Sequence, residues 1–210
     1  LSELVANDEG SSYNKVSFFQ KVNGKRVIKT VIKKTSISRD IPNLQLGNET
    51  LDDAAIYAVN GNVFTCDELT EGYDVRQDKG HQYSDGIVAI NQFALEKAGF
   101  GGKTVHLATG LPVQQFFGGQ LGKDEELISK KESAFIDADI KNQLDSDGRP
   151  MEVDESRLVK IASNRVMPEA VGAYLDVMIS DEGKLDREFT GDVLVVDMGS
   201  FTTDVAMVGP

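Results

Sequence analysis

The pattern of apolar and polar residues predicts a chain rich in strands that are joined by tight turns. Val193–Val196 is a continuous apolar run with three β-branched residues, which is typical of a strand buried on both faces. The run ends at Asp197 and apolar residues resume at Val205–Val208, so this region predicts two strands joined by a turn. Three more strands, with Asn23-Gly24 as a hairpin turn, are expected near the start of the chain at 4–6, 15–20 and 26–32.

Helical spacing is clearest at Tyr83–Ala98, where apolar residues recur every three or four positions. Ser84 is suited to cap the start of this helix, and Gly99 is suited to end it. Asn60-Gly61 predicts a second hairpin turn. The remaining expected elements are strands at 104–109 and 158–166, a helical stretch at 124–131, and a helix from Pro168 to about Ser180. This mixture of strands and helices predicts an α/β fold.

The hairpins at the two ends of the chain share a sequence pattern. Asp8-x-Gly10-Ser11 is followed by Lys15-Val16, and Asp197-x-Gly199-Ser200 is followed by Asp204-Val205 at the same spacing. The two copies lie 189 residues apart, from position 8 to position 197. Repeat proteins have periods of about 20–50 residues. The longer spacing therefore predicts two similar domains that face each other across a cleft.

A polyphosphate with a metal ion suits such a pair of hairpins. Backbone N–H groups in a Gly/Ser turn form an anion-binding concavity, and glycine admits the positive φ that turns successive amides inward. Asp8 and Asp197 are candidate ligands of Mg²⁺, because this ion takes one or two carboxylates and otherwise keeps water and phosphate oxygens. Lys15 lies on the outgoing strand and is a candidate to compensate phosphate charge.

These hairpins resemble known phosphate-binding motifs. D-E-G-S-S-Y-N-K at Asp8–Lys15 resembles the first phosphate motif of the actin, Hsp70 and sugar-kinase superfamily, and D-M-G-S-F-T-T-D at Asp197–Asp204 resembles the second. Three further stretches resemble the bacterial actins of the ParM/StbA plasmid-segregation type, namely Gln82–Asp85, Thr109–Pro112 and Val166–Ala170. The resemblance implies an actin-like ATPase (ribonuclease H-like) domain of the α/β class, with a mixed sheet flanked by helices and a small inserted α+β subdomain.

The resemblance also implies a division of the chain. Residues 1–167 are expected to form domain I, with the small subdomain inserted at about 35–80. Residues 168–180 are expected to form an interdomain helix, and 181–210 the first hairpin of domain II, whose remainder would lie beyond Pro210. In actin-like proteins the small subdomain is a place where filament contacts form. A surface insertion without a partner is the alternative.

By the same resemblance, ATP is expected to lie between the hairpins, with Mg²⁺ held by Asp8 and Asp197. The expected phosphate-binding residues are Gly10, Ser11, Ser12, Asn14, Lys15, Gly199, Ser200, Phe201, Thr202 and Thr203. Phe201 stands where much of the superfamily has a small residue. Glu169 is the expected catalytic residue, because Met167-Pro168-Glu169 resembles the ParM segment whose glutamate orients the attacking water. A purely structural role is the alternative, since an acidic side chain in the first turn of a helix complements the helix dipole.

Composition and charge restrict the cellular compartment and the partners that we expect for this protein. The single cysteine, Cys66, rules out an internal disulfide and fits a reducing compartment. No apolar run approaches the roughly 18 residues of a membrane span, and the N-terminus lacks a signal pattern, so a cytoplasmic protein without membrane contact is expected. A net charge of −12 argues against direct binding of DNA, because Lys and Arg supply most of that affinity. A separate adaptor protein is therefore expected to hold the plasmid DNA.

The function implied by the resemblance is an ATPase whose homopolymeric filaments move low-copy plasmids apart. A sugar or acetate kinase and an Hsp70-like chaperone share both phosphate motifs and stay as alternatives. A chromosomal actin-like scaffold that binds nucleotide but barely hydrolyses it is the third. Nucleotide-dependent filament formation separates the filament formers from kinases and chaperones, and turnover separates the plasmid motor from the scaffold. The preference for ATP over GTP rests on the resemblance alone.

Overall fold

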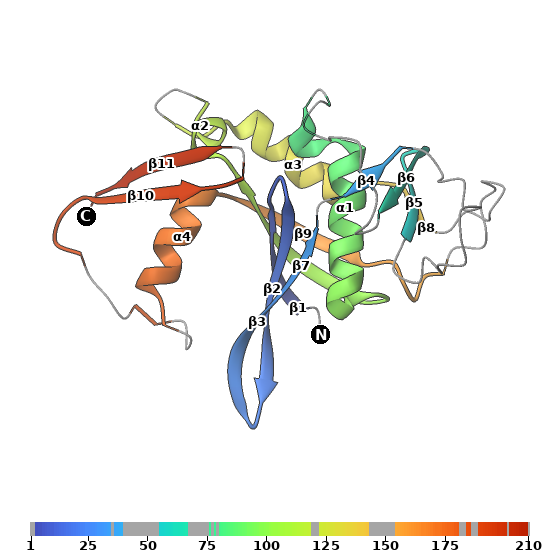
Figure 1. The fold of residues 1–210 in the computed structure, drawn as a ribbon, viewed down its shortest axis with the longest axis horizontal. Coiled ribbons are helices and arrows are strands. Elements are labelled where there is room, and N and C mark those ends of the chain that lie inside the picture. The colour runs from blue at the N-terminus through green and yellow to red at the C-terminus, as the bar shows by residue number, and fades with distance from the viewer. Residues whose placement is uncertain are drawn as a thin grey trace.

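A five-stranded mixed sheet lies at the centre of the computed structural model, in the order β3-β2-β1-β7-β9 (Figure 1). Strands β1, β7 and β9 run parallel, while β2 and β3 are antiparallel to their neighbours. The structure describes residues 3–34, 36–39, 55–66, 76, 78, 80–118, 122–142, 154–180, 184–185, 189–200 and 202–209. The strands of this sheet are β1 Glu3–Glu9, β2 Tyr13–Val22, β3 Lys25–Lys34, β7 Thr104–Leu111 and β9 Lys160–Pro168.

A second, smaller sheet is antiparallel and has the order β4-β6-β5-β8. Its strands are β4 Ile37–Ser38, β5 Ala55–Val59, β6 Asn62–Cys66 and β8 Ile140–Asn142. Strand β8 pairs with β5 although it lies far outside the range 35–80 that the sequence predicted for the inserted subdomain. A mixed sheet with a small additional sheet is as predicted, while the domain boundaries stay a prediction.

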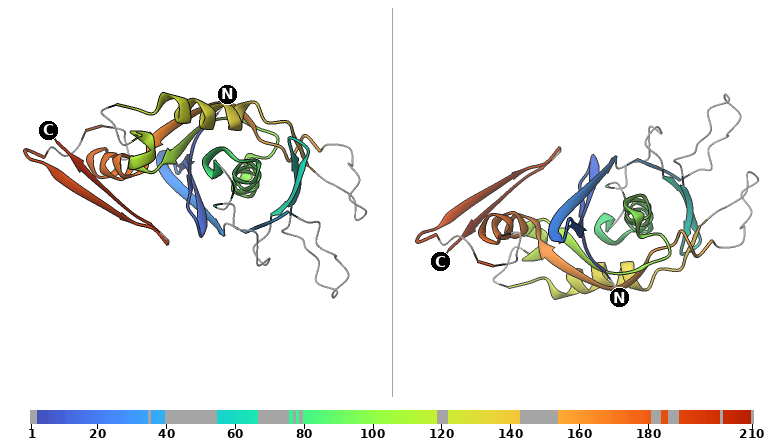
Figure 2. Two further views of the ribbon diagram at one scale, coloured as in Figure 1. Left: turned by 90° about the horizontal axis from the view of Figure 1, so that it is seen from above. Right: turned by 90° about the horizontal axis from the view of Figure 1, so that it is seen from below.

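Helix α1, Asp85–Leu95, lies between the two sheets and is buried on every side (Figure 2). It contacts β1 and β2 of the large sheet and β5 and β6 of the small one. Val5 and Val16 from the large sheet and Tyr57 and Phe64 from the small sheet share one hydrophobic cluster with this helix. A helix that is buried on all sides is stable only when it is enclosed, and most of the buried residues of α1 are apolar. The two sheets and α1 therefore form one common core.

The ends of α1 agree with the sequence. The Ser84 hydroxyl accepts a hydrogen bond from the Ile87 backbone N–H at 3.4 Å, which satisfies one of the free donors at the helix start. After Leu95 the chain continues as a π-helical turn over Glu96–Phe100, and Gly99 within it has a φ of 91°. Only glycine adopts this left-handed backbone without strain, so the expected stop at Gly99 is confirmed.

Both predicted Asn-Gly hairpin turns are present. Asn23 and Gly24 have φ values of 51° and 80°, and Asn60 and Gly61 have values of 50° and 86°. Positive φ at both central residues is the geometry of a type I′ turn, whose twist matches that of the strands it joins. The two turns therefore set the pairing of β2 with β3 and of β5 with β6.

Helices α2, α3 and α4 contact β9, the edge strand of the large sheet. Helix α3 packs on β9 and begins at Asp124, whose carboxylate accepts a hydrogen bond from the Leu127 backbone N–H at 3.0 Å. The helix predicted from Pro168 is present as α4, but Pro168 is its N-cap rather than its first residue, because it pairs with Leu111 as the last residue of β9 and has an extended backbone. The remaining helices are a 3₁₀ turn at His81–Tyr83, α2 Val113–Phe116, α3 Glu125–Ile136 and α4 Glu169–Met178. None of the described helices is long and apolar enough to cross a membrane.

A separate hairpin of β10, Val193–Met198, and β11, Thr203–Val208, stands over α4 (Figure 1). The expectation that its first strand is buried on both faces is wrong, because Leu194 is 58% exposed and Val196 is 48% exposed. Within the described residues, β10 pairs only with β11, and α4 packs against one face of the hairpin. Val193 and Val195 are therefore partly buried, while the face with Leu194 and Val196 is exposed.

Replacement of a core residue of α1 should lower the free energy of unfolding much more than the same replacement at an exposed position. Ile90 is 2% exposed and Ile136, at the end of α3, is 43% exposed. Ile90→Ala should lower the free energy of unfolding by about 2–5 kcal/mol, because it leaves a cavity between the sheets. Ile136→Ala should change it by less than about 1 kcal/mol. Urea denaturation followed by circular dichroism measures both, and equal losses would contradict the burial of α1.

Candidate functional site

The hairpins β1–β2 and β10–β11 are geometrically equivalent. Asp8 pairs with Lys15 across the first, and Asp197 pairs with Asp204 across the second, so each aspartate faces the residue seven positions later. The last pair before each turn also corresponds, since Glu9↔Asn14 and Met198↔Thr203 both join residues five positions apart. The repeated sequence pattern therefore encodes the same strand register and the same turn length twice.

Glycine is needed in these turns for close approach rather than for a positive φ. Neither Gly10 nor Gly199 has a left-handed backbone, so the expected reason for these glycines is wrong. A Cβ atom at Gly10 would lie 2.6 Å from the Tyr13 carbonyl oxygen, and one at Gly199 would lie 3.2 Å from the Thr202 carbonyl oxygen. The Gly199 N–H donates to that Thr202 oxygen at 2.9 Å. The two glycines occupy equivalent places and let the turn fold tightly back on itself.

The first hairpin presents an ion pair at its surface and an amide pair beneath it. The Lys15 ammonium donates to the Asp8 carboxylate at 2.7 Å, and both side chains are half exposed. The Asn14 side chain is buried and accepts a hydrogen bond from the Asn7 amide at 3.0 Å. Ser11 is exposed and Ser12 is partly buried. The expected binding residues of this hairpin thus lie at or near the surface, apart from Asn14, which supports the strand from within.

The second hairpin presents two like charges instead of an ion pair. Asp197 and Asp204 lie directly opposite each other, a placement that destabilises a strand pair when no cation is near. The expected binding residues Ser200, Thr202 and Thr203 are all exposed. Phe201, which the sequence also assigned to this turn, lies outside the described residues.

Glu169 is the first residue of α4 and lies against the end of β7. A Cβ atom at Gly110 would lie 2.5 Å from the Glu169 Cγ atom, so only glycine at that position leaves room for this side chain. Burial raises the pKa of Glu169 to about 7. Burial is the largest cause of this raised pKa; the Lys131 ammonium opposes the rise, and the negative charges of Asp8 and Asp204 contribute to it.

The same charges connect both hairpins with Glu169. The hydrogen bond to Asp8 raises the pKa of Lys15, and the negative charges of Asp197 and Glu169 add to this rise. The structure therefore brings Asp8 and Lys15 of the first hairpin, Asp197 of the second, and Glu169 into one electrostatic site.

A buried network that the sequence analysis did not predict lies behind this site. The Lys131 ammonium is 1% exposed and donates to the Glu9 carboxylate at 2.6 Å, to the Gln82 side-chain oxygen at 2.8 Å and to the Gly110 carbonyl at 2.7 Å. The other Glu9 oxygen accepts from the Asn91 amide at 2.8 Å. Burial raises the pKa of Glu9, and the Lys131 charge offsets part of this rise. Lys131 thereby holds the carbonyl of the glycine against which Glu169 lies.

The sequence contained one signal for Lys131. The buried residues of α3 are Ile128, Lys131 and Phe135, which recur at helical spacing. A lysine at an apolar position of an amphipathic helix is stable only with a buried partner. The neighbouring Lys130 is half exposed and forms an ordinary surface ion pair with Glu126.

The carboxylates of the site suit a divalent cation that accompanies an anionic ligand. Among the described residues, the site contains five carboxylates, from Asp8, Glu9, Glu169, Asp197 and Asp204, and two ammonium groups, from Lys15 and Lys131. The described residues include no group of three or more side chains that could hold a metal without other ligands. Mg²⁺ does not need one, because it takes one or two carboxylates and fills its other positions with water or phosphate oxygens. The exposed Asp8 and Asp197 fit that requirement.

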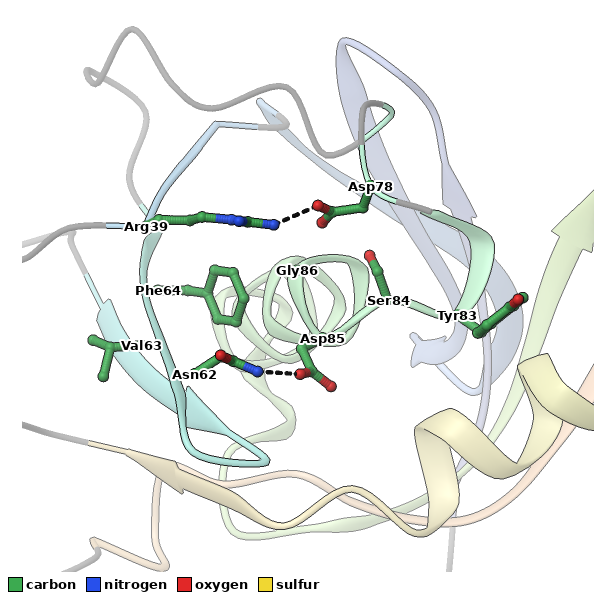
Figure 3. A pocket seen from close by; sticks show the side chains of 9 residues that line it. All are labelled: Arg39, Asn62, Val63, Phe64, Asp78, Tyr83, Ser84, Asp85 and Gly86. Carbon is green, nitrogen blue, oxygen red and sulfur yellow. Dashed lines mark hydrogen bonds and ion pairs between the residues drawn. The ribbon is translucent and has the colours of Figure 1, made fainter. Parts of the chain in front are cut away.

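A polar cavity of about 440 Å³ lies elsewhere, between the small sheet and the start of α1 (Figure 3). Arg39 and Asp78 form an ion pair at its edge, and the Asn62 amide donates to the Asp85 carboxylate at 2.6 Å. None of the expected site residues lines it. The cavity is therefore separate from the site between the hairpins.

Comparison with known protein families shows which family the chain belongs to. The family model described as "Plasmid segregation protein ParM, N-terminal" matches residues 4–180. The chain belongs to this family. No curated protein sequence matches the chain. The ParM-type resemblance of the sequence is thus confirmed by a match that includes β1–β2, α1, Lys131 and Glu169.

Solved structures confirm the actin-like fold. The chain is similar to Ta0583, an archaeal actin homologue, with a TM-score of 0.63 and 20% identity over 99% of this chain and 57% of that one. It is also similar to the AlfA filament bound to AMPPNP (TM-score 0.56, 15% identity, 100% and 66% coverage) and to a Bacillus thuringiensis ParM hybrid protein with ADP (TM-score 0.54, 14% identity, 99% and 28% coverage). The chain therefore spans less than two thirds of the length of each of these proteins.

A methyl group at Gly10 should strain the first hairpin. Gly10→Ala should lower the free energy of unfolding by about 1–3 kcal/mol, because the added carbon meets backbone that cannot move aside. Gly172 in α4 has open space around it, so Gly172→Ala should stabilise the chain by about 0.5–1 kcal/mol. Thermal and urea denaturation of both variants measure the contrast. Gly10→Ala with unchanged stability would contradict the tight turn.

Removal of the Lys131 ammonium should lower the free energy of unfolding, and a second substitution at Glu9 should restore most of it. Lys131→Met leaves the Glu9 charge buried without its partner and should lower the free energy of unfolding by about 3–5 kcal/mol. Adding Glu9→Gln should restore most of this loss, since no buried charge then remains. Lys130→Met is the matched control and should cost less than about 1 kcal/mol. A double-mutant cycle by urea denaturation tests this, and strictly additive losses would contradict the pairing.

Proposed function

We propose that this chain is the nucleotide-binding part of an actin-like ATPase that forms nucleotide-dependent filaments and segregates low-copy plasmids. The observation that carries the proposal is the shared register of the two hairpins, which presents Asp8 and Asp197 at equivalent positions beside Glu169. Turns of this kind expose backbone N–H groups and hydroxyls toward a common ligand. A nucleotide polyphosphate is the ligand that fits both hairpins at once.

In this proposal the two turns grip the phosphates of ATP. Gly10, Ser11 and Ser12 of the first hairpin bind the phosphates. Lys15 compensates phosphate charge when its ammonium group bonds a phosphate oxygen in addition to Asp8. Asn14, buried beneath them, keeps the first strand pair in register. The second hairpin contributes Gly199, Ser200, Phe201, Thr202 and Thr203.

Asp8 and Asp197 would hold Mg²⁺, which supplies charge neutralisation for the transferred phosphoryl group when it is bound. The protein's own contribution is the placement of the two carboxylates. Asp8 is already oriented by Lys15, and Asp197 is set opposite Asp204, whose repulsion a cation would relieve.

Glu169 is the proposed catalytic residue. It orients a water molecule whose oxygen forms a bond to the γ-phosphorus as the bond from that phosphorus to the ADP oxygen breaks, and its carboxylate takes the proton that the water loses. A carboxyl group with a pKa of about 7 is suited to this task, because it is ionised often enough to accept a proton and basic enough to keep it. Lys131 and Gly110 act as positioning residues, since they fix the surface against which Glu169 lies.

Filament formation and plasmid segregation are proposed for the whole protein, in the cytoplasm. The family description and the filaments formed by AlfA support self-association of a similar kind. A separate adaptor bound to the plasmid is proposed to make the DNA contact, because the chain carries a net charge of −12. Residues 168–180, which include α4, are proposed to connect domain I (1–167) with the domain that 181–210 begins.

Substitution of Glu169 should separate assembly from turnover. In the full-length protein with MgATP, Glu169→Ala should release phosphate at least about 100-fold more slowly than wild type while still assembling, because binding stays intact and proton transfer is lost. Its filaments should persist after wild-type filaments have disassembled.

Wild-type phosphate release should increase as the pH rises through about 7 and then level off, because Glu169 must be ionised to accept the proton. Light scattering and a phosphate-release assay measure these quantities together.

Glu125 provides the control for a purely structural role of Glu169. It also lies in the first turn of a helix, α3, but is exposed and far from the hairpins in sequence. Glu125→Ala should leave phosphate release within about twofold of wild type, although it removes the same helix-dipole interaction. Phosphate transfer to a small acceptor without light scattering would instead indicate a kinase, and stable filaments without wild-type turnover would indicate a scaffold.

A further inference from the structure

The hairpin of β2 and β3 differs sharply in charge from the rest of the chain. We call residues 13–34 the basic hairpin, because this segment contains no acidic residue. Its seven basic residues are Lys15, Lys21, Lys25, Arg26, Lys29, Lys33 and Lys34. Of the 22 basic side chains in the protein, 15 remain for the other residues, against all 34 acidic side chains, which gives those residues a net charge of −19. A strongly acidic protein thus presents one strongly basic element.

The outer part of the basic hairpin extends away from the body of the molecule (Figure 1). Strand β1 pairs with β2 only as far as the Val5↔Phe18 pair. Beyond it, the segment 19–28 pairs with no other strand of the described residues and only with itself, down to the turn at Asn23 and Gly24. This outer part is accessible on both faces and on both edges.

The cations of the outer part repel one another and are not neutralised. Lys21 and Arg26 lie directly opposite each other, a placement that destabilises a strand pair. Lys21, Lys25 and Arg26 of the outer part and the adjoining Lys29 are all exposed, and the described part of the chain offers none of them a carboxylate within ion-pair distance. Arg26 lies over the ring of Phe19 at 3.6 Å, which holds its guanidinium in place at the surface. The hairpin therefore keeps an unbalanced positive charge in a fixed position.

We propose that the basic hairpin docks on an acidic face of a second copy of this protein and forms one contact of the filament. This inference rests on the proposed function, which supplies the filament. Charge complementarity favours this occupant, because every copy carries −19 outside its own hairpin. Duplex DNA is the competing polyanion, but the acidic body that surrounds the hairpin repels DNA and attracts the hairpin of another copy.

Charge reversal in the full-length protein tests the contact. The variant Lys21→Glu, Lys25→Glu, Lys29→Glu changes the charge by six units and places a carboxylate opposite Arg26, so the hairpin itself gains an attractive pair and should stay folded. The matched control is Lys130→Glu, Lys141→Glu, Lys160→Glu, which makes the same charge change at exposed lysines outside the hairpin. Sedimentation with MgATP gives the critical concentration for assembly of each protein. Thermal denaturation and binding of a fluorescent ATP analogue verify that each variant is folded and binds nucleotide.

The hairpin variant should assemble at a critical concentration at least about tenfold above wild type, and the control within about threefold. Raising the salt concentration should weaken wild-type assembly, because salt screens the attraction between the basic hairpin and the acidic face. It should not weaken assembly of the hairpin variant, in which salt screens only the repulsion between negatively charged copies.

Equal critical concentrations for the hairpin variant and the control would overturn the proposal. Stronger assembly of the hairpin variant would also overturn it, and would show that the lysines serve to keep a sheet edge from pairing. Wild-type binding of a labelled DNA duplex that the hairpin variant loses, with assembly unchanged, would assign the hairpin to nucleic acid instead. Wild-type protein that binds ATP but never assembles would overturn the proposed filament function itself, which is a different result from any of these.

Discussion

The buried ion pair between Glu9 and Lys131 is the interaction on which the site depends. An isolated charge inside a protein is costly, so each of the two side chains is stable there only because of the other and of the hydrogen bonds around them. The pair joins the end of β1 to α3, and Lys131 extends the link to the Gly110 carbonyl at the end of β7. Three elements that are distant in sequence are thereby held in one place, and Glu169 lies against the surface that they form.

The site is assembled at the carboxyl ends of the parallel strands. Strand β1 ends in Asp8 and Glu9, β7 reaches Gly110 near its end, and β9 leads directly into Glu169. Parallel strands bring their carboxyl ends to the same edge of a sheet, and ligands of α/β proteins commonly bind there. The antiparallel strand β2 adds Lys15 by folding back from the end of β1. The topology therefore gathers the polar side chains of the site at one edge of the sheet.

Local patterns predicted much of this arrangement. The Asn-Gly turns, the limits set by Ser84 and Gly99, and the repeated hairpin pattern were all readable, because each depends on residues close together in sequence. The burial of Lys131 was not predicted, since its partners Glu9, Gln82 and Gly110 come from three other parts of the chain. Strand β8 joined the small sheet across a similar gap. The apolar run of β10 predicted burial, but burial depends on which elements cover a strand, and that information does not lie in the strand itself.

The two hairpins have the same register but not the same charge. Lys15 faces Asp8 in one, and Asp204 faces Asp197 in the equivalent place of the other. Two hairpins of the same register and the same charge would bind a linear ligand equally well in either direction. Two hairpins of the same register but unequal charge bind the two ends of that ligand differently. The ligand therefore has one preferred orientation, although the backbones of the two hairpins are equivalent. The exchange of Lys15 for Asp204 at the equivalent position reverses one charge and so contributes to this preferred orientation.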